Sequence, residues 1–130
     1  MSKTAIKAEN ITRRLEGEIK ITLVDSANVE IKQGEFIVVT GPSGSGKSSL
    51  LYLLGLLDKP TSGKIWLGDT DVSSYDEDQL ADIRLKELGF VFQFHFLLPE
   101  FSALENVMLP MQRLGKLSPA EIKERAQELL

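Results

Sequence analysis

The sequence has 130 residues, of which 42% are hydrophobic and 26% are charged, a balance typical of a globular domain that buries a core. Its formal net charge of -4 argues against a nucleic-acid partner, because phosphate backbones bind basic surfaces. The absence of cysteine excludes a disulfide framework and suits a reducing cytosol, and no apolar run has the length that direct membrane insertion requires.

The first half of the chain predicts strands followed by a helix. Apolar and polar residues alternate over 19–23 and 29–31, as in strands with one solvent-exposed face. The continuous apolar run 36–39 is typical of a strand that is covered on both faces. Leucines then lie almost all the way round a helix over 50–57, so we expect this helix to be deeply buried. Another short strand is predicted over 64–67.

The second half predicts helices, with one further buried strand over 90–92. The spacing Ser-x-x-Glu, which allows a capping box at a helix start, occurs at 74–77, 102–105 and 118–121. Pro110 should kink or split the second of these helices. The apolar stripe of the third still runs where the sequence stops, so we expect a truncated domain.

A glycine-rich segment between the predicted strand and the buried helix matches the phosphate-loop pattern G-x-x-x-x-G-K-[ST]. The candidate phosphate-binding residues are Gly41, Pro42, Ser43, Gly44, Ser45, Gly46, Lys47, Ser48 and Ser49. Glycines let backbone N–H groups point at a phosphate, and the helix that follows adds its positive end. Lys47 can reach the β- and γ-phosphates, and the Ser48 hydroxyl can ligate Mg²⁺. The loop alone leaves the class of nucleotide-binding protein open, since kinases, GTPases and ATPases share it.

Beyond the loop, the sequence resembles the ATP-binding cassette (ABC) family. Residues 54–68 (LGLLDKPTSGKIWLG) are similar to the family's segment after the loop, and residues 88–93 (LGFVFQ) to the strand that ends at the Q-loop glutamine. Residues 94–107 (FHFLLPEFSALENV) resemble the subgroup of lipoprotein-releasing, macrolide-export and cell-division transporters, and most closely the lipoprotein-release ATPases.

The resemblance implies an α/β fold, in which a P-loop NTPase core with a parallel sheet carries an antiparallel β layer. Residues 1–93 would form the N-terminal part of the nucleotide-binding domain, and residues 94–130 the Q-loop and the start of the helical subdomain. It implies ATP and Mg²⁺ as cofactors, with Gln93 joining Ser48 at the metal and sensing the attacking water. The implied partners are a second nucleotide-binding domain, paired head to tail, and transmembrane permease subunits at the cytoplasmic face of the inner membrane.

One departure from the family concerns adenine. The family usually stacks an aromatic residue on the base, but residues 13–17 (RRLEG) offer none. Arg14 could stack its guanidinium plane there, or Leu15 could pack against the base more weakly. The single histidine, His95, lies among phenylalanine and leucine residues and is more typical of a packed side chain than of a catalytic one. A stripe that includes Met108 and Met111 is likewise typical of core packing.

Three parts of a working ABC ATPase do not occur in these 130 residues. They are the signature loop, the acidic Walker B strand with its catalytic glutamate, and the switch histidine. We therefore expect the full-length protein to be an ATPase and this fragment to bind nucleotide without hydrolysing it. Two alternatives remain open here: a soluble ABC-type ATPase of DNA repair or chromosome maintenance, and a pure nucleotide-binding or interaction module.

Overall fold

A computed structural model describes residues 3–130 and divides the chain into two compact units, Met1–Arg84 and Leu85–Leu130. The first unit contains β1 (Thr4–Leu15), β2 (Ile21–Lys32), α1 (Lys47–Leu54), β3 (Ser62–Leu67), β4 (Thr70–Asp71) and most of α2 (Glu77–Glu87). The second contains α3 (Ala103–Leu114) and α4 (Pro119–Leu129). The predicted domain boundary at residue 93 remains a prediction.

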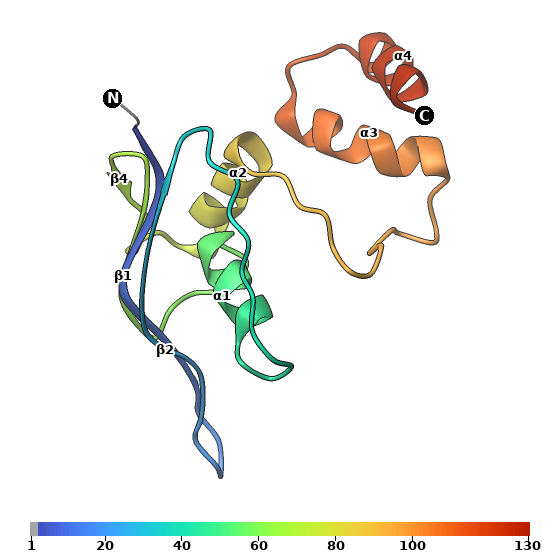
Figure 1. Ribbon diagram of the computed structural model, residues 1–130. Coiled ribbons are helices and arrows are strands. Elements are labelled where there is room, and N and C mark those ends of the chain that lie inside the picture. The colour runs from blue at the N-terminus through green and yellow to red at the C-terminus, as the bar shows by residue number, and fades with distance from the viewer. Residues whose placement is uncertain (1–2) are drawn as a thin grey trace. The chain divides into compact units, whose positions relative to one another are not determined.

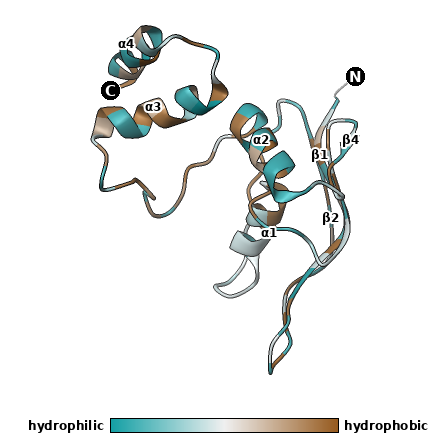
Figure 2. Cartoon of the chain, turned by 180° about the vertical axis from the view of Figure 1, so that it is seen from behind, coloured by the Kyte–Doolittle hydropathy of each residue, from teal (hydrophilic) through white to brown (hydrophobic). Residues whose placement is uncertain are grey.

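The strands form one antiparallel sheet with the order β2-β1-β3-β4 (Figure 1). This confirms the predicted antiparallel layer, to which β1 contributes the longest pairings. Helices α1 and α2 lie on the same side of this sheet, as the view from behind also shows (Figure 2). Buried apolar residues from the strands, from both helices and from the turns that follow α1 and β4 form the core: Ala8, Ile11, Val24, Leu53, Leu54, Leu56, Ile65, Val72 and Leu80.

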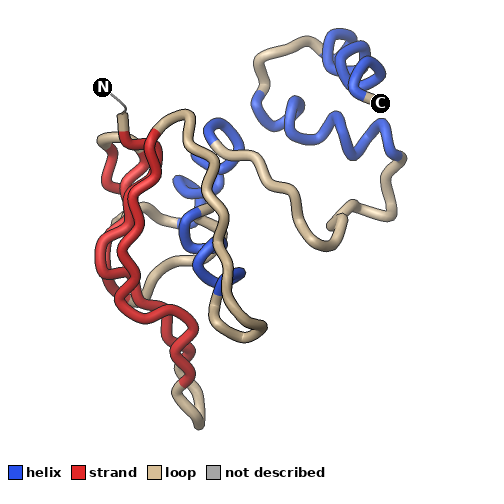
Figure 3. Tube along the Cα trace, viewed as in Figure 1, coloured by secondary structure: helices blue, strands red, loops and turns tan. Residues whose placement is uncertain are grey.

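The predicted parallel sheet is not formed by residues 3–130. The segments 36–39 and 90–92, which we expected to be buried strands, run as unpaired loop (Figure 3). Phe36 is 91% exposed, and Val91 is also exposed. A strand is stable only when a neighbour satisfies its backbone N–H and C=O groups, and no described segment pairs with either of these two. The α/β class is nevertheless correct, since helices cover one face of the sheet.

Helix α1 is less buried than its sequence suggested. Leu53 and Leu54 face the core, whereas Leu51 and Tyr52 are exposed. The apolar pattern all round the helix therefore exceeds what the sheet of residues 3–130 can cover. After the helix, the buried Leu56 adopts a left-handed conformation (φ 61°), and its carbonyl accepts a hydrogen bond from Arg84 of α2.

The predicted helix starts are confirmed in two cases of three. Capping boxes are present at Ser102 with Glu105 and at Ser118 with Glu121. Helix α2 instead uses a reciprocal pair two positions later than we expected, in which Asp76 and Gln79 exchange side-chain-to-backbone hydrogen bonds. Pro110 does not split α3, which continues to Leu114.

The second unit is held by the packing of α3 against α4, which buries Ile122 and Ala126. Asn106 ties the preceding loop to α3: its carboxamide accepts from the Leu98 N–H and donates to carbonyls of Leu98, Phe101 and Ser102. Within residues 3–130, every helix is too short or too polar to span a bilayer.

The cap of α4 makes a pH-dependent contribution to the stability of the second unit. The pKa of Glu121 lies below its ordinary value of 4.5, first because the Ser118 N–H donates to its carboxylate and then because the Ser118 hydroxyl also interacts with it. A lowered folded-state pKa means that this stabilisation is present above the ordinary value and is lost as the pH falls through the folded value.

We therefore expect α4 to fray upon acidification, as measured by the NMR titration of the Glu121 carboxyl carbon together with the amide shifts of α4. In Glu121→Gln, which keeps a side-chain oxygen as acceptor, this acid-induced change should disappear. A Glu121 carboxyl that titrates at its ordinary value would contradict the prediction.

Candidate nucleotide-binding site

The phosphate loop joins the extended segment 36–40 to α1, whose first helical residue is Lys47. The residue before it, Gly46, is left-handed (φ 95°), and no side chain caps the start of the helix. The unsatisfied N–H groups and the positive end of the helix dipole are therefore available to an anion. This local geometry is the one that the loop sequence predicts.

Gly46 has a second reason to be glycine besides its backbone angle. A Cβ atom at this position would lie 2.5 Å from the carbonyl oxygen of Leu23 in β2. Leu23 is the extra residue of a bulge in β2, since Arg13 pairs with Val24 and Arg14 with Thr22. The bulge thus places the backbone of β2 directly against the last glycine of the phosphate loop. Sequence reasoning missed this contact, because periodicity gives no register between strands.

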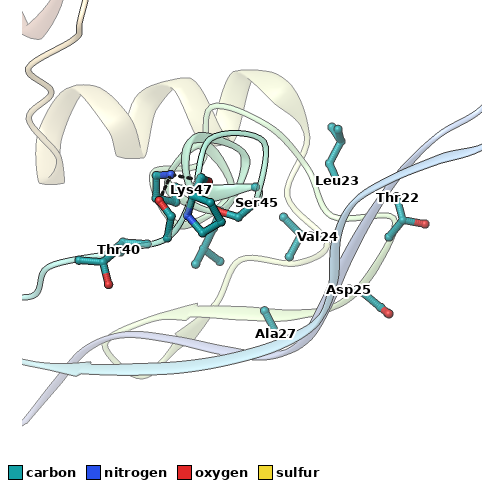
Figure 4. Close-up of a pocket in the computed structure, with 13 residues that line it drawn as sticks. Thr22, Leu23, Val24, Asp25, Ala27, Thr40, Ser45 and Lys47 are labelled. Atoms are coloured by element: carbon teal, nitrogen blue, oxygen red, sulfur yellow. Dashed lines mark hydrogen bonds between the residues drawn. The ribbon is translucent and has the colours of Figure 1, made fainter.

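Lys47 lies across the loop that it follows. Its ammonium group donates hydrogen bonds to the carbonyl oxygens of Gly41, at 2.6 Å, and Pro42, at 2.8 Å. Figure 4 shows these bonds as dashed lines, with Ser45 beside the lysine. Phosphate oxygens carry negative charge and accept stronger hydrogen bonds than neutral carbonyls do, so an incoming phosphate can take over the ammonium group.

A pocket of ≈ 580 Å³ lies between the phosphate loop and β2. Its lining includes Thr40 and Gly41 of the loop side and residues 22–25 of the strand. In Figure 4, Val24 points toward the loop, whereas Thr22 and Asp25 point away from it. The bulge at Leu23 accounts for the opposite directions of Thr22 and Val24, which would otherwise share one face.

Of the remaining candidate residues for ATP and Mg²⁺, Ser48 and Gln93 are exposed and Ser49 is half-buried. Ser48 and Ser49 lie in the first turn of α1, where the Ser48 side chain is open to solvent. Gln93 lies in the other unit, on an exposed loop. Hydroxyl and carboxamide oxygens are hard donors of the kind that Mg²⁺ accepts together with phosphate oxygens, so the residues fit this metal. Their role as metal ligands stays a prediction.

The candidates for contact with the base, Arg14 and Leu15, end β1 at the hairpin to β2. Arg14 lies opposite Thr22, and Leu15 lies opposite Ile21. Directly opposite residues point to the same face, so Arg14 shares the direction of Thr22, away from the phosphate loop (Figure 4). Leu15 follows Arg14 in the strand and therefore points to the opposite face of the hairpin, where both Leu15 and Ile21 are exposed.

The loop around Gln93 is rich in exposed aromatic side chains. Phe92 stacks on Phe90 at 5.5 Å between ring centroids and meets Phe96 edge-on at 4.9 Å. The segment between α2 and α3 carries brown, apolar stretches in Figure 2. The expectation of a packed His95 was wrong: the side chain is exposed, and its Nδ1 accepts a hydrogen bond from the Leu97 N–H.

Known proteins of similar sequence are ATP-binding proteins of transporters, which agrees with a nucleotide-binding site at the phosphate loop. The sequence profile of the ABC transporter family matches residues 24–130. The lipoprotein-releasing system ATP-binding protein of Chlorobium chlorochromatii is 48% identical over 132 residues, which covers 100% of this chain and 54% of that protein. The corresponding protein of Aquifex aeolicus is 47% identical and covers 96% of this chain.

The fold is also similar to that of solved ATP-binding cassettes. A dimeric ATP-binding cassette in a post-hydrolysis state, bound to ADP and Pi, superposes with a TM-score of 0.87 at 42% identity and covers 95% of this chain. A second dimeric cassette, described as a bacterial ABC transporter cassette, also has a TM-score of 0.87, at 43% identity. The chain spans about half the length of these proteins, with 54% of each covered. By its profile match, its relatives and its fold, the chain belongs to the ABC transporter family.

Proposed function

We propose that this chain carries the phosphate-binding part of the ATP-binding subunit of a lipoprotein-releasing ABC transporter. The observation that carries the proposal is the phosphate loop, in which left-handed Gly46 and the uncapped start of α1 lie beside the Lys47 ammonium group. The substrate class comes from the relatives at 47% and 48% identity, which are named lipoprotein-releasing system ATP-binding proteins.

In this proposal the loop holds the triphosphate of ATP. Backbone N–H groups at the start of α1 and the Lys47 ammonium bind the β- and γ-phosphates, which concentrates positive charge where the transition state gains negative charge. The Ser48 hydroxyl would hold Mg²⁺, with Gln93 as a further candidate ligand from the other unit, and the metal would neutralise phosphate charge. Gln93 also orients the attacking water. A neighbouring structure is described as bound to ADP and Pi, which supports an adenine nucleotide.

For the base, the direction of the side chains favours Leu15 over Arg14. Leu15 shares neither the face nor the direction of Thr22, which points away from the phosphate loop. An aliphatic side chain covers a base by apolar contact but lacks the stacking energy of an aromatic ring. We therefore expect weaker binding of adenine than in cassettes that have an aromatic residue here.

The proposed partners are a second nucleotide-binding domain and transmembrane permease subunits. Both solved neighbours are described as dimeric, which supports pairing of two cassettes. Exposed apolar side chains next to Gln93, among them Phe94 at 66% and Phe96 at 62%, provide a surface for a permease subunit. With such partners the protein would lie at the cytoplasmic face of the inner membrane.

The rival functions fit less well. A role in DNA repair or chromosome maintenance is not favoured, because the relatives are named for lipoprotein release and the net charge is -4. The other rival is a nucleotide-binding module that catalyses no reaction. The sequence of the longer protein distinguishes it from the proposed subunit, because such a module would lack the signature loop and the catalytic glutamate.

Calorimetric titration with ATP, combined with a turnover assay, tests the proposal. We expect the 130-residue chain to bind ATP, more tightly with Mg²⁺ than without it, because the metal offsets repulsion between phosphates. We expect no steady turnover, since these residues contain no Walker B strand and no signature loop.

A folded chain that does not bind ATP would contradict nucleotide binding by this segment. Sustained Mg²⁺-dependent turnover by the 130 residues would contradict the assignment of hydrolysis to the longer protein. The full-length protein with its permease serves as the positive control for hydrolysis.

A further inference from the structure

The loop that follows α1 is tied to the end of β1. The Asp58 carboxylate accepts a hydrogen bond from Arg13 Nε at 2.7 Å, which is also an ion pair. Thr61 donates its N–H to the carbonyl of Thr12 at 2.7 Å, and its hydroxyl oxygen accepts from the Arg14 N–H at 2.9 Å. Three successive residues of β1 are thus held by the segment 58–61.

The ion pair is better placed than the other ion pairs of the sheet. The side chains of Arg13 and Asp58 are 28% and 37% exposed, against 42% and 44% for Lys7 and Glu9 on the same strand. Less solvent between the charges means less screening, so the pair holds its geometry more firmly. Asp58 Oδ1 is itself fixed by the Lys59 N–H.

The two ends of α1 therefore both meet the β1–β2 hairpin. At the first end, the Leu23 carbonyl of β2 lies against Gly46 of the phosphate loop. At the other end, Arg13 of β1 binds Asp58, four residues after the last residue of the helix, Leu54. One contact holds β2 and the other holds β1, so the paired strands of the hairpin cannot tilt freely relative to α1. Leu15 lies only two residues beyond Arg13.

We propose that Arg13 and Asp58 are positioning residues for the nucleobase. The ion pair fixes the end of β1 relative to α1, so that Leu15 is held at a set distance from the phosphates bound at the other end of the helix. The inference rests on the proposed function, since it requires that nucleotide phosphates bind at Lys47. The Arg13–Asp58 pair acts on the contact with the base and not on the contacts with the phosphates.

The test compares ATP with inorganic tripolyphosphate, which has the phosphates without the base. Affinities of Asp58→Asn for both ligands are measured by calorimetry in Mg²⁺, with melting temperature and circular dichroism as checks of folding. Asparagine keeps an oxygen for the Lys59 N–H but loses the charge that binds Arg13. We expect about a threefold to tenfold loss of ATP affinity and unchanged tripolyphosphate affinity. Glu9→Gln, which breaks the Lys7–Glu9 pair on the same strand, should change neither.

A second variant separates positioning from general destabilisation. If Asp58 acts through Leu15, then Asp58→Asn in a Leu15→Ala background should cause no further loss of ATP affinity. Equal losses for ATP and tripolyphosphate, or additive losses in the double variant, would overturn the positioning role. If the wild type binds both ligands equally, the base is not contacted and the inference fails while phosphate binding stands. If it binds neither, the proposed function fails first.

Discussion

Replacement of Lys47 by alanine should weaken Mg²⁺-dependent ATP binding by about a hundredfold or more, because a charge-assisted contact to phosphate is lost in a concave site. The ammonium group already lies over the loop, bonded to the Gly41 and Pro42 carbonyls. It is therefore held where a phosphate would be bound, and little ordering is needed upon binding. Calorimetric titration of both proteins with ATP measures the effect.

The matched control is Lys59→Ala, which removes an exposed lysine that follows the other end of α1. It has the same charge change but lies away from the loop, so ATP affinity should stay within about twofold of wild type. If Lys47→Ala bound ATP as tightly as this control does, the phosphate site would have to lie elsewhere. The melting temperatures of the two variants show whether any loss of binding reflects unfolding.

The parts of the molecule that local sequence determines were predicted well. The helix start after Gly46 and the capping boxes at Ser102 and Ser118 each depend on a few neighbouring residues, so their pattern is sufficient. The phosphate contacts of the loop stay a prediction. Alternation predicted strands over 19–23 and 29–31, and the single strand β2 covers most of these residues. In each case the signal and the structure lie within one short stretch of chain. The antiparallel layer itself was implied by the family resemblance, and the strand β1 was not predicted.

The parts that depend on contacts between distant residues were not predicted. The bulge at Leu23 and the Arg13–Asp58 ion pair arise from the register of strands and the path of a loop, which no local pattern encodes. The segments 36–39 and 90–92 show the converse. Their composition is correct for buried strands, but burial requires neighbours that residues 3–130 do not provide. Composition therefore indicates that a segment is suited to a buried strand, whereas burial and pairing also depend on whether neighbouring segments are present.

Replacement of Gly63 by alanine should lower the stability of the first unit by about 3 kcal/mol or more. Gly63 in β3 is left-handed (φ 94°) and lies opposite a bulge of β1, where Asn10 is also left-handed (φ 50°). A Cβ atom at Gly63 would meet the Asn10 carbonyl and come within 2.6 Å of the Ile11 Cα, so the two strands would have to separate. Ile11 is fully buried, and its displacement would open the core. Urea unfolding followed by the fluorescence of the single tryptophan, in β3, reports on this unit.

Gly68→Ala is the control, since Gly68 is left-handed (φ 56°) with nothing within 4 Å of a Cβ. This substitution should lower the stability by only about 1 kcal/mol. Equal costs for the two variants would show that the strands yield and that backbone angle alone determines the need for glycine.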